Sequence, residues 1–180
     1  MKGKNILIGI TGGMAAYKMP EFCRLLIKSG ASVRVISTKA GLKFVSPVVF
    51  EALTRTPLYY DPFAFIEGMP SHIFLGEWAE AVFVAPASAD FLAKAACGMG
   101  DELLLSTLLA TKSPVGLAPS MNWKMWEHGA TQKNVAALKE LGYGILEPDY
   151  GELACGEGKG RLPGQDKMLD FLNGLLAASE

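Results

Sequence analysis

The sequence is poor in the residues that build disulfides and metal sites. Among 180 residues it has two histidines and three cysteines, Cys23, Cys97 and Cys155. The cysteines are odd in number and form no CxxC or Cys/His spacing, so the sequence indicates neither a disulfide framework nor a zinc site. No metal is expected, and at least one cysteine is expected to be a free thiol with a chemical role. Cys23 and Cys97 fall in expected helices and are expected to be buried structural cysteines.

Runs of like charge and long apolar segments are also missing. With 17 basic and 18 acidic residues the formal net charge is −1, which removes the electrostatic case for a nucleic-acid partner. No apolar run approaches the roughly 18 residues of a membrane-spanning helix. The start, MKGKNILIGITGG, lacks the cleavage region of a signal peptide. We therefore expect a cytoplasmic protein with no membrane or nucleic-acid partner.

The sequence is rich in apolar residues. They make up 50% of the chain and charged residues 19%, which lies at the apolar edge of soluble globular proteins. Some of this apolar surface is expected to contact another subunit. The length suits one domain over residues 1–180 with a single substantial core.

Short apolar runs alternate with segments of helical length and period, which is typical of an α/β protein. Because the runs are apolar at successive positions, both faces of the sheet are expected to be covered. The sequence predicts a Rossmann-like or flavodoxin-like parallel sheet with helices on both faces. The expected strands are 5–11, 32–37, 81–87, 115–119 and 144–148; the expected helices are 15–29, 90–97, 101–112, 130–141 and 166–177; segments 55–71 and 149–164 are expected to be irregular.

The turn after the first expected strand, GITGGMAAYK at residues 9–18, is suited to an anion. It matches neither the GxGxxG dinucleotide pattern nor a Walker loop. Gly12, Gly13 and Met14 nevertheless let backbone N–H groups approach an anion at the start of a helix. A plain strand-to-helix turn is the alternative interpretation.

The turns after the second and third strands point to a mononucleotide phosphate. Ser37, Thr38 and Lys39 stand where a dinucleotide enzyme would place a carboxylate for its ribose. Hydroxyls and an ammonium suit a phosphate, and FMN needs no such carboxylate. In APASADF, Ser88 and the neighbouring N–H groups offer a further anion site, with an ordinary helix N-cap as the alternative.

The stretch LAPSMNWKMWEHGATQ, residues 117–132, places two tryptophans, two methionines, an asparagine and a histidine after an expected strand. An exposed cluster of this kind marks a binding surface, because monomers rarely expose large apolar patches. Asn122 has a helix N-cap as its alternative role, and His128 is expected to be structural or exposed.

Five motifs occur in a characteristic order: GITGGMAAYK, SHIFLGEWA, APASAD, PSMNWKMW and LACGEGKGR. On these motifs the chain resembles the homo-oligomeric flavin-containing cysteine decarboxylases, and among them the phosphopantothenoylcysteine decarboxylases, from about residue 4 to about residue 164. PSMNWKMW fits the family's PxMNxxMW signature at every fixed position. Asp90 and Phe91 depart from the Asn and Thr usual in the PASANT motif, which leaves the expectation of FMN binding in place.

The resemblance implies roles for particular residues. His72 is implied as the catalytic base, Asn122 as the contact to the substrate carboxylate, and Cys155 as the proton donor on a flap at about 149–164. A histidine just inside a helix capped by Ser71 is the alternative for His72. Implied cofactor-binding residues are Gly12, Gly13, Met14, Ser37, Thr38, Lys39, Ser88, Ala89, Asp90 and Ser120; implied substrate-binding residues are Met121, Asn122, Ala154, Cys155 and Gly156.

The resemblance also implies a reaction and an assembly. The implied reaction is FMN-dependent decarboxylation of 4′-phosphopantothenoyl-cysteine to 4′-phosphopantetheine in coenzyme A biosynthesis, by a homotrimer or homododecamer. The flavin would oxidise the carbon that bears the thiol, so that the resulting thioaldehyde accepts the electrons released with carbon dioxide. Two alternatives are a peptidyl-cysteine decarboxylase and a non-catalytic FMN-binding homologue. Bifunctional members add a cysteine-ligating synthetase domain, an activity expected to reside elsewhere here.

Overall fold

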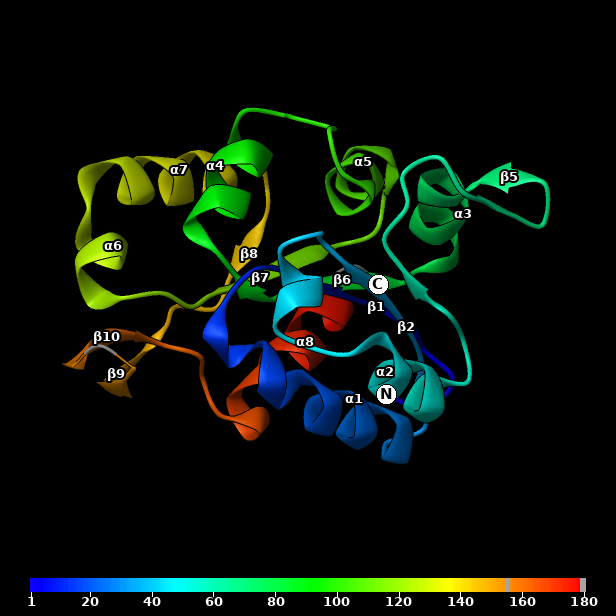
Figure 1. The fold of residues 1–180 in the computed structure, drawn as a ribbon, viewed down its shortest axis with the longest axis horizontal. Coiled ribbons are helices and arrows are strands. Elements are labelled where there is room, and N and C mark those ends of the chain that lie inside the picture. The colour runs from blue at the N-terminus through cyan, green and yellow to red at the C-terminus, as the bar shows by residue number, and fades with distance from the viewer. Residues whose placement is uncertain (155, 179–180) are drawn as a thin grey trace.

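A six-stranded parallel sheet forms the centre of the molecule. The computed structural model describes residues 1–154 and 156–178 of the chain. The strands lie in the order β3-β2-β1-β6-β7-β8, and every neighbouring pair is parallel (Figure 1). The chain adds strands on one side of β1 and then on the other, which makes the gap between β1 and β6 a topological switch point. The strands are β1 (Asn5–Ile10), β2 (Ser32–Ser37), β3 (Leu58–Tyr59), β6 (Ala81–Ala87), β7 (Val115–Pro119) and β8 (Gly144–Ile145).

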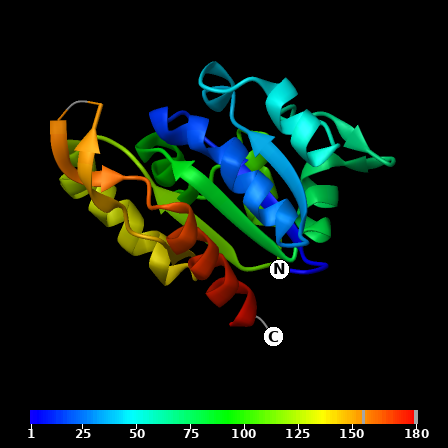
Figure 2. The ribbon, with the colours of Figure 1, turned by 90° about the horizontal axis from the view of Figure 1, so that it is seen from below.

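Helices cover both faces of this sheet, as Figures 1 and 2 show, so the predicted fold class is confirmed. One buried cluster packs α1, α2 and α8 on the sheet, and a second packs α3, α4, α5 and α7 on the other face. Among the described residues no helix combines the length and apolar character needed to cross a bilayer. The helices are α1 (Met19–Lys28), α2 (Pro47–Thr54), α3 (Ser71–Trp78), α4 (Ala89–Ala96), α5 (Leu103–Ala110), α6 (Trp123–Glu127), α7 (Gly129–Glu140) and α8 (Gln165–Ala177), with short 3₁₀ turns η1 (Met14–Lys18) and η2 (Gly41–Lys43).

The central strands are apolar at successive positions because each face meets a different cluster. In β1, Ile6 and Ile8 belong to the first cluster, whereas Leu7 between them belongs to the second. This alternation follows from the two-residue period of a strand. In β6 every residue is buried, and the Phe83 ring lies 5.9 Å from the rings of both Phe22 and Phe171.

Two segments expected to be irregular contain strands. Within 55–71 the chain forms β3 and an antiparallel pair, β4 (Phe65–Ile66) and β5 (Met69–Pro70). Within 149–164 it forms an antiparallel hairpin of β9 (Asp149–Leu153) and β10 (Gly156–Arg161). Glycine at alternate positions of β10 hid its strand pattern, because glycine has no side chain to mark which face is buried. The sequence also failed to predict α2, and it indicated α3 and the short α6 only through the alternative roles of His72 and Asn122.

Replacing Phe83 by alanine tests the central packing. The change removes a fully buried ring between two others, so we expect the free energy of unfolding to fall by about 3–5 kcal/mol. Urea unfolding followed by circular dichroism measures this loss. Leu141→Ala is the control, because Leu141 is exposed and its replacement should change stability by less than about 0.5 kcal/mol. Equal losses in the two variants would contradict the packing described.

Candidate functional site

A cavity of about 440 Å³ lies beside the switch point of the sheet. Its walls come from the turns that follow β1, β6 and β7 and from the β9–β10 hairpin. Ligands of open α/β sheets bind at the carboxyl ends of the strands, where the strand order reverses. The cavity therefore lies where this fold is expected to bind a small molecule.

Thr11 joins the turns after β1 and β6. Its hydroxyl donates a hydrogen bond to the Pro86 carbonyl at 2.7 Å and accepts one from the Ser88 N–H at 2.9 Å. The side chain is buried, so water does not compete for these bonds. Sequence reasoning noted Thr11 only as a departure from a glycine pattern. Its role is to fix the two turns relative to each other.

The glycine turn packs closely on its neighbours and lines the cavity. A Cβ on Gly12 would lie 2.6 Å from Cβ of Ala40, and one on Gly13 would lie 3.4 Å from Cγ of Pro86. Gly12, Gly13, Met14, Ser88 and Ala89 all line the cavity, as predicted. The Gly13 N–H donates to the Thr11 carbonyl and the Ser88 N–H to the Thr11 hydroxyl, both at 2.9 Å. The amides of Gly12, Met14 and Ala89, at the starts of η1 and α4, remain as donors that fit the phosphate of a mononucleotide.

The predicted N-cap at Ser88 is also present. Its Oγ accepts a hydrogen bond from the Phe91 N–H at 3.2 Å. The hydroxyl therefore shapes the start of α4, and the backbone is left to meet the ligand.

Four residues predicted to bind the cofactor do not line the cavity in this chain. Ser37 Oγ donates to the Thr38 carbonyl at 3.0 Å, and Thr38 Oγ1 accepts from the Gly41 N–H at 3.1 Å. Both hydroxyls thus stabilise their own turn. Lys39 is exposed, and the exposed Asp90 carboxylate lies 3.5 Å from the Lys94 ammonium.

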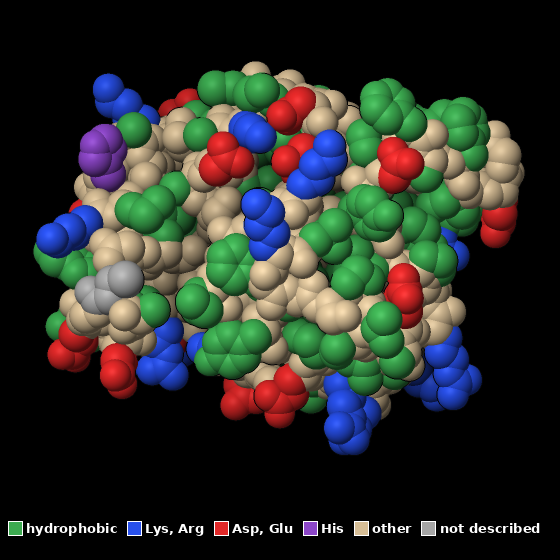
Figure 3. All heavy atoms as spheres, viewed as in Figure 1, with side chains coloured by type: hydrophobic (Ala, Val, Ile, Leu, Met, Phe, Trp, Pro, Cys, Tyr) green, Lys and Arg blue, Asp and Glu red, His purple; other side chains and the backbone are tan. Residues whose placement is uncertain are grey.

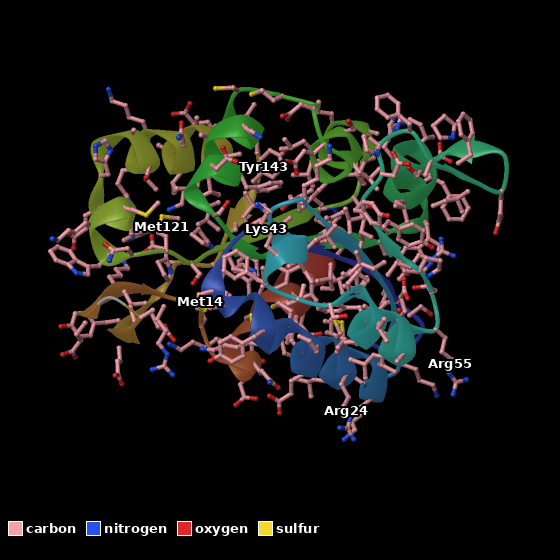
Figure 4. The ribbon with its side chains drawn as sticks, viewed as in Figure 1. Met14, Arg24, Lys43, Arg55, Met121 and Tyr143 are labelled. Carbon is pink, nitrogen blue, oxygen red and sulfur yellow. The ribbon has the colours of Figure 1, made fainter. Side chains whose placement is uncertain are left out.

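The PSMNW loop supplies the third wall, from Ser120, Met121, Asn122 and Met125. Asn122 Oδ1 accepts a hydrogen bond from the Lys124 N–H at 2.9 Å and so caps α6, as its alternative role predicted. Its amide nitrogen remains a donor at the cavity. Figure 4 labels Met14 on the turn after β1 and Met121 on the loop before α6. Asn122 can therefore cap a helix and bind a ligand carboxylate at once.

The β9–β10 hairpin packs directly on this loop. The Gly160 carbonyl accepts hydrogen bonds from Ser120 Oγ at 3.2 Å and from the Met121 N–H at 3.0 Å. A Cβ on Gly160 would collide with the Met121 carbonyl, and one on Gly158 would lie 2.6 Å from Cβ of Trp123. These glycines permit close packing of hairpin and loop. Of the predicted substrate residues in the hairpin, Ala154 lines the cavity and Gly156 does not, and Cys155 lies outside the described residues.

His72 does not reach the cavity of its own chain. It is the second residue of α3, is half-buried, and is not among the residues that line the cavity. Figures 1 and 2 both place α3 at the opposite end of the molecule from the hairpin. The expected cap is wrong, because Ser71 Oγ donates to the Asp61 carbonyl at 3.4 Å and forms no cap bond. His128 is structural, as expected: its Nδ1 accepts from the Ala130 N–H at 3.2 Å at the start of α7.

The two cysteines of the described residues differ in their surroundings. Cys23 is buried in α1, and burial raises the pKa of its thiol to about 12, which makes it a poor nucleophile. This confirms its predicted structural role. Cys97 is exposed at the end of α4, so the expectation that it is buried is wrong. The helix carrying it ends at Ala96, one residue before the thiol.

Several residues of the cavity were not predicted from the sequence. Tyr17 and Lys18 follow the glycine turn, Phe44 follows η2, and Arg161 and Leu162 follow the glycines of the hairpin. The sequence carried a signal for Arg161, since it ends the ACGEGKGR motif. Phe44 had none, because nothing in the sequence brings η2 next to the cavity.

Replacing Gly160 by alanine tests the contact between hairpin and loop. The new methyl group would collide with the Met121 carbonyl, so we expect the free energy of unfolding to fall by about 1–3 kcal/mol. Trypsin should also cleave the chain faster after Arg161. Gly164→Ala is the matched control, because a Cβ there meets nothing within 4 Å. Cleavage of the Gly160 variant at the unmodified rate would argue against this packing.

Comparison with known proteins identifies the family. The sequence matches the family described as Flavoprotein over residues 1–177. Over 166 residues it is 45% identical to the coenzyme A biosynthesis bifunctional protein CoaBC of Vibrio parahaemolyticus, covering 90% of this chain and 41% of that protein. The chain thus spans about two fifths of the length of that curated relative.

Solved structures agree over nearly the whole chain. A PPC decarboxylase mutant complexed with pantothenoylaminoethenethiol matches with a TM-score of 0.86 at 30% identity and covers 100% of both chains. The FMN-dependent cysteine decarboxylase SpaF matches with a TM-score of 0.85 at 31% identity, covering 99% of this chain and 98% of that one. The resemblance predicted from the motifs is confirmed, and the chain belongs to the flavoprotein family.

Proposed function

We propose that this chain is an FMN-dependent decarboxylase that converts 4′-phosphopantothenoyl-cysteine to 4′-phosphopantetheine in coenzyme A biosynthesis. The observation that carries the proposal is a single cavity in which the glycine turn faces the PSMNW loop and the hairpin. The relatives named for coenzyme A biosynthesis and for PPC decarboxylation support it.

The residues present fit FMN. The amides of Gly12, Met14 and Ala89 would hold its phosphate, and Met14 and Met121 would offer apolar surface to its ring. When bound, FMN supplies a hydride acceptor that makes decarboxylation of an acylated cysteine feasible and then returns the hydride. The chain's own part is to orient the substrate and to move protons.

Asn122 orients the substrate. With Oδ1 engaged by the Lys124 N–H, its amide nitrogen is held as a donor toward the cavity. A donor at that position binds the carboxylate that will leave as carbon dioxide. The cap fixes the side chain beforehand, so little rotamer freedom remains to be lost on binding.

His72 acts in the cavity of a neighbouring copy. In the proposed reaction its imidazole takes the substrate thiol proton as a general base. Because α3 lies far from the cavity of its own chain, a second subunit must bring it there. Cys155, which lies between β9 and β10 in the sequence, is proposed as the donor of the final proton.

Two exposed apolar surfaces fit this assembly. Near the cavity, Met14 and Tyr17 are 63% and 64% exposed; near α3, Phe63 and Phe65 on the segment through β4 are 86% and 69% exposed. Figure 3 shows apolar side chains gathered over α3 and this segment. Contact between two different surfaces of one chain is heterologous, and such contacts form a ring when the rotation between neighbouring subunits closes. A homotrimer, alone or as the unit of a dodecamer, satisfies this requirement.

Asn122→Asp tests the carboxylate contact. Aspartate caps a helix as well as asparagine does, so we expect α6 and the melting temperature to be retained. The donor is lost and a second carboxylate faces the substrate's own, so kcat/KM should fall about ten- to hundredfold. Carbon dioxide release measures this. Asn134→Asp makes the same chemical change in α7, outside the cavity. A normal kcat/KM for the Asn122 variant would show that Asn122 does not bind the substrate carboxylate.

Mixed oligomers test whether the site is shared. We expect the His72→Asn homo-oligomer to lose its activity with its base, and the Asn122→Asp homo-oligomer to keep about a tenth to a hundredth of the unmodified activity. Co-expressed in equal amounts, they should recover roughly a quarter of the unmodified activity, because a quarter of the cavities pair an intact Asn122 with a neighbour's intact His72. An inactive mixture, in oligomers shown by mass spectrometry to contain both chains, would place both residues in one chain's site.

A further inference from the structure

Two cationic side chains line the cavity. Lys18 ends η1, and Arg161 ends β10. Their chain neighbours, Met19 and Leu162, belong to the same buried cluster. The two elements therefore rest on one core, and each brings a cation to the same cavity.

Neither cation has a carboxylate partner within residues 1–154 and 156–178. Other lysines around the hairpin do: the Lys159 ammonium lies 2.6 Å from the Glu147 carboxylate, and that of Lys167 lies 2.7 Å from Asp149. Glu152 is the acidic residue of the described cavity lining. Lys18, Arg161 and Glu152 together therefore give the cavity lining one net positive charge.

Contact with the facing strand of the hairpin fixes the position of the Arg161 side chain. A Cβ on Gly151 would lie 3.1 Å from Nη1 and 3.2 Å from Cδ of Arg161. The arginine side chain therefore lies across Gly151 of the facing strand, in space that a larger residue would narrow. A guanidinium held in this way presents several N–H donors in a fixed plane, which suits the oxygens of a phosphate.

The cavity already has donors for two other anionic groups. The backbone amides of Gly12, Met14 and Ala89 suit the cofactor phosphate, and the Asn122 amide suits a carboxylate. The Lys18–Arg161 pair is a third polar locus, made of side-chain charges and not of backbone amides. A substrate that carries a phosphate at the end remote from its cysteine supplies the third anion.

We propose that Arg161, assisted by Lys18, binds the phosphate of the substrate and thereby selects 4′-phosphopantothenoyl-cysteine over unphosphorylated or peptidyl cysteines. The inference rests on the proposed function and names the residues that set its substrate class. A peptide that ends in cysteine has no phosphate to neutralise the pair.

The test compares three substrates on the FMN-loaded protein: 4′-phosphopantothenoyl-cysteine, pantothenoyl-cysteine and a peptide with a C-terminal cysteine. We expect the unmodified protein to favour the phosphorylated substrate by at least about tenfold in kcat/KM, the effect of a hydrogen bond to a charged group. Arg161→Met should abolish most of this preference through KM, because it should lower kcat/KM for the phosphorylated substrate far more than for pantothenoyl-cysteine. Arg161→Lys should restore part of it.

Lys159→Met is the matched control. It removes one positive charge from the same strand, but its ammonium is paired with Glu147 and the residue does not line the cavity. The preference for the phosphorylated substrate should therefore persist. If the Lys159 variant also lost the preference, the preference would come from the overall charge of the hairpin, and the proposed role of Arg161 would be wrong.

FMN titration followed by flavin fluorescence separates the remaining outcomes. Unchanged FMN affinity in Arg161→Met, together with lost preference, supports the proposal. Weakened FMN binding with an unchanged preference would assign the cations to the cofactor phosphate instead. If the unmodified protein decarboxylates both pantothenoyl substrates equally, the inference fails and the proposed function stands. If it decarboxylates only the peptide, the proposed function itself fails.

Discussion

The buried hydroxyl of Thr11 is the interaction on which the geometry of the cavity depends. Parallel strands that diverge at a switch point leave their following turns free to separate. Thr11 prevents this by donating to the Pro86 carbonyl and accepting from the Ser88 N–H. The turn with Gly12 and Gly13 and the start of α4 therefore face one cavity as a unit. A phosphate held by both turns meets donors that are already in place, which limits the ordering cost of binding.

The opposite wall of the cavity is also held in place by hydrogen bonds before a ligand binds. The Gly160 carbonyl takes hydrogen bonds from two successive residues of the PSMNW loop. Asn122 then points its amide to the cavity because its own oxygen caps α6. The hairpin thus has a fixed base on the loop, while Glu152–Ala154 reach the cavity from its other strand. The glycine content of this segment reflects the contact distance at its base, where a side chain would strike backbone or tryptophan atoms.

The central fold could be predicted because a strand buried on both faces is apolar at successive positions of the sequence. β1, β2, β6 and β7 are runs of apolar residues, and the turns that follow them begin the cavity. β3, β4 and β5 could not be predicted, since two-residue strands are too short for any period to register. The hairpin was missed because glycine fills the positions that would show alternation.

The site was predictable where a residue acts through its backbone or ends a motif, as at Gly12, Ser88 and Asn122. It was not predictable where tertiary packing decides. Ser37 and Thr38 have suitable hydroxyls, but their own turn uses them. Phe44 comes to the cavity only because η2 folds back beside it. No local pattern reports such an approach.

The separation of His72 from the cavity links the apolar composition to the chemistry. Under the proposed mechanism the base and the binding loop lie at opposite ends of one chain, so a neighbouring copy in a homo-oligomer would be needed to complete the site. The contact then joins two unlike surfaces, the cavity rim with Met14 and the α3 region with Phe63, both strongly exposed in one subunit. Burying these surfaces would supply the association energy, and closing the ring would leave no rim unpaired. In this arrangement assembly and activity depend on the same contact, so a separated subunit could hold ligands in its cavity without the group that starts the reaction.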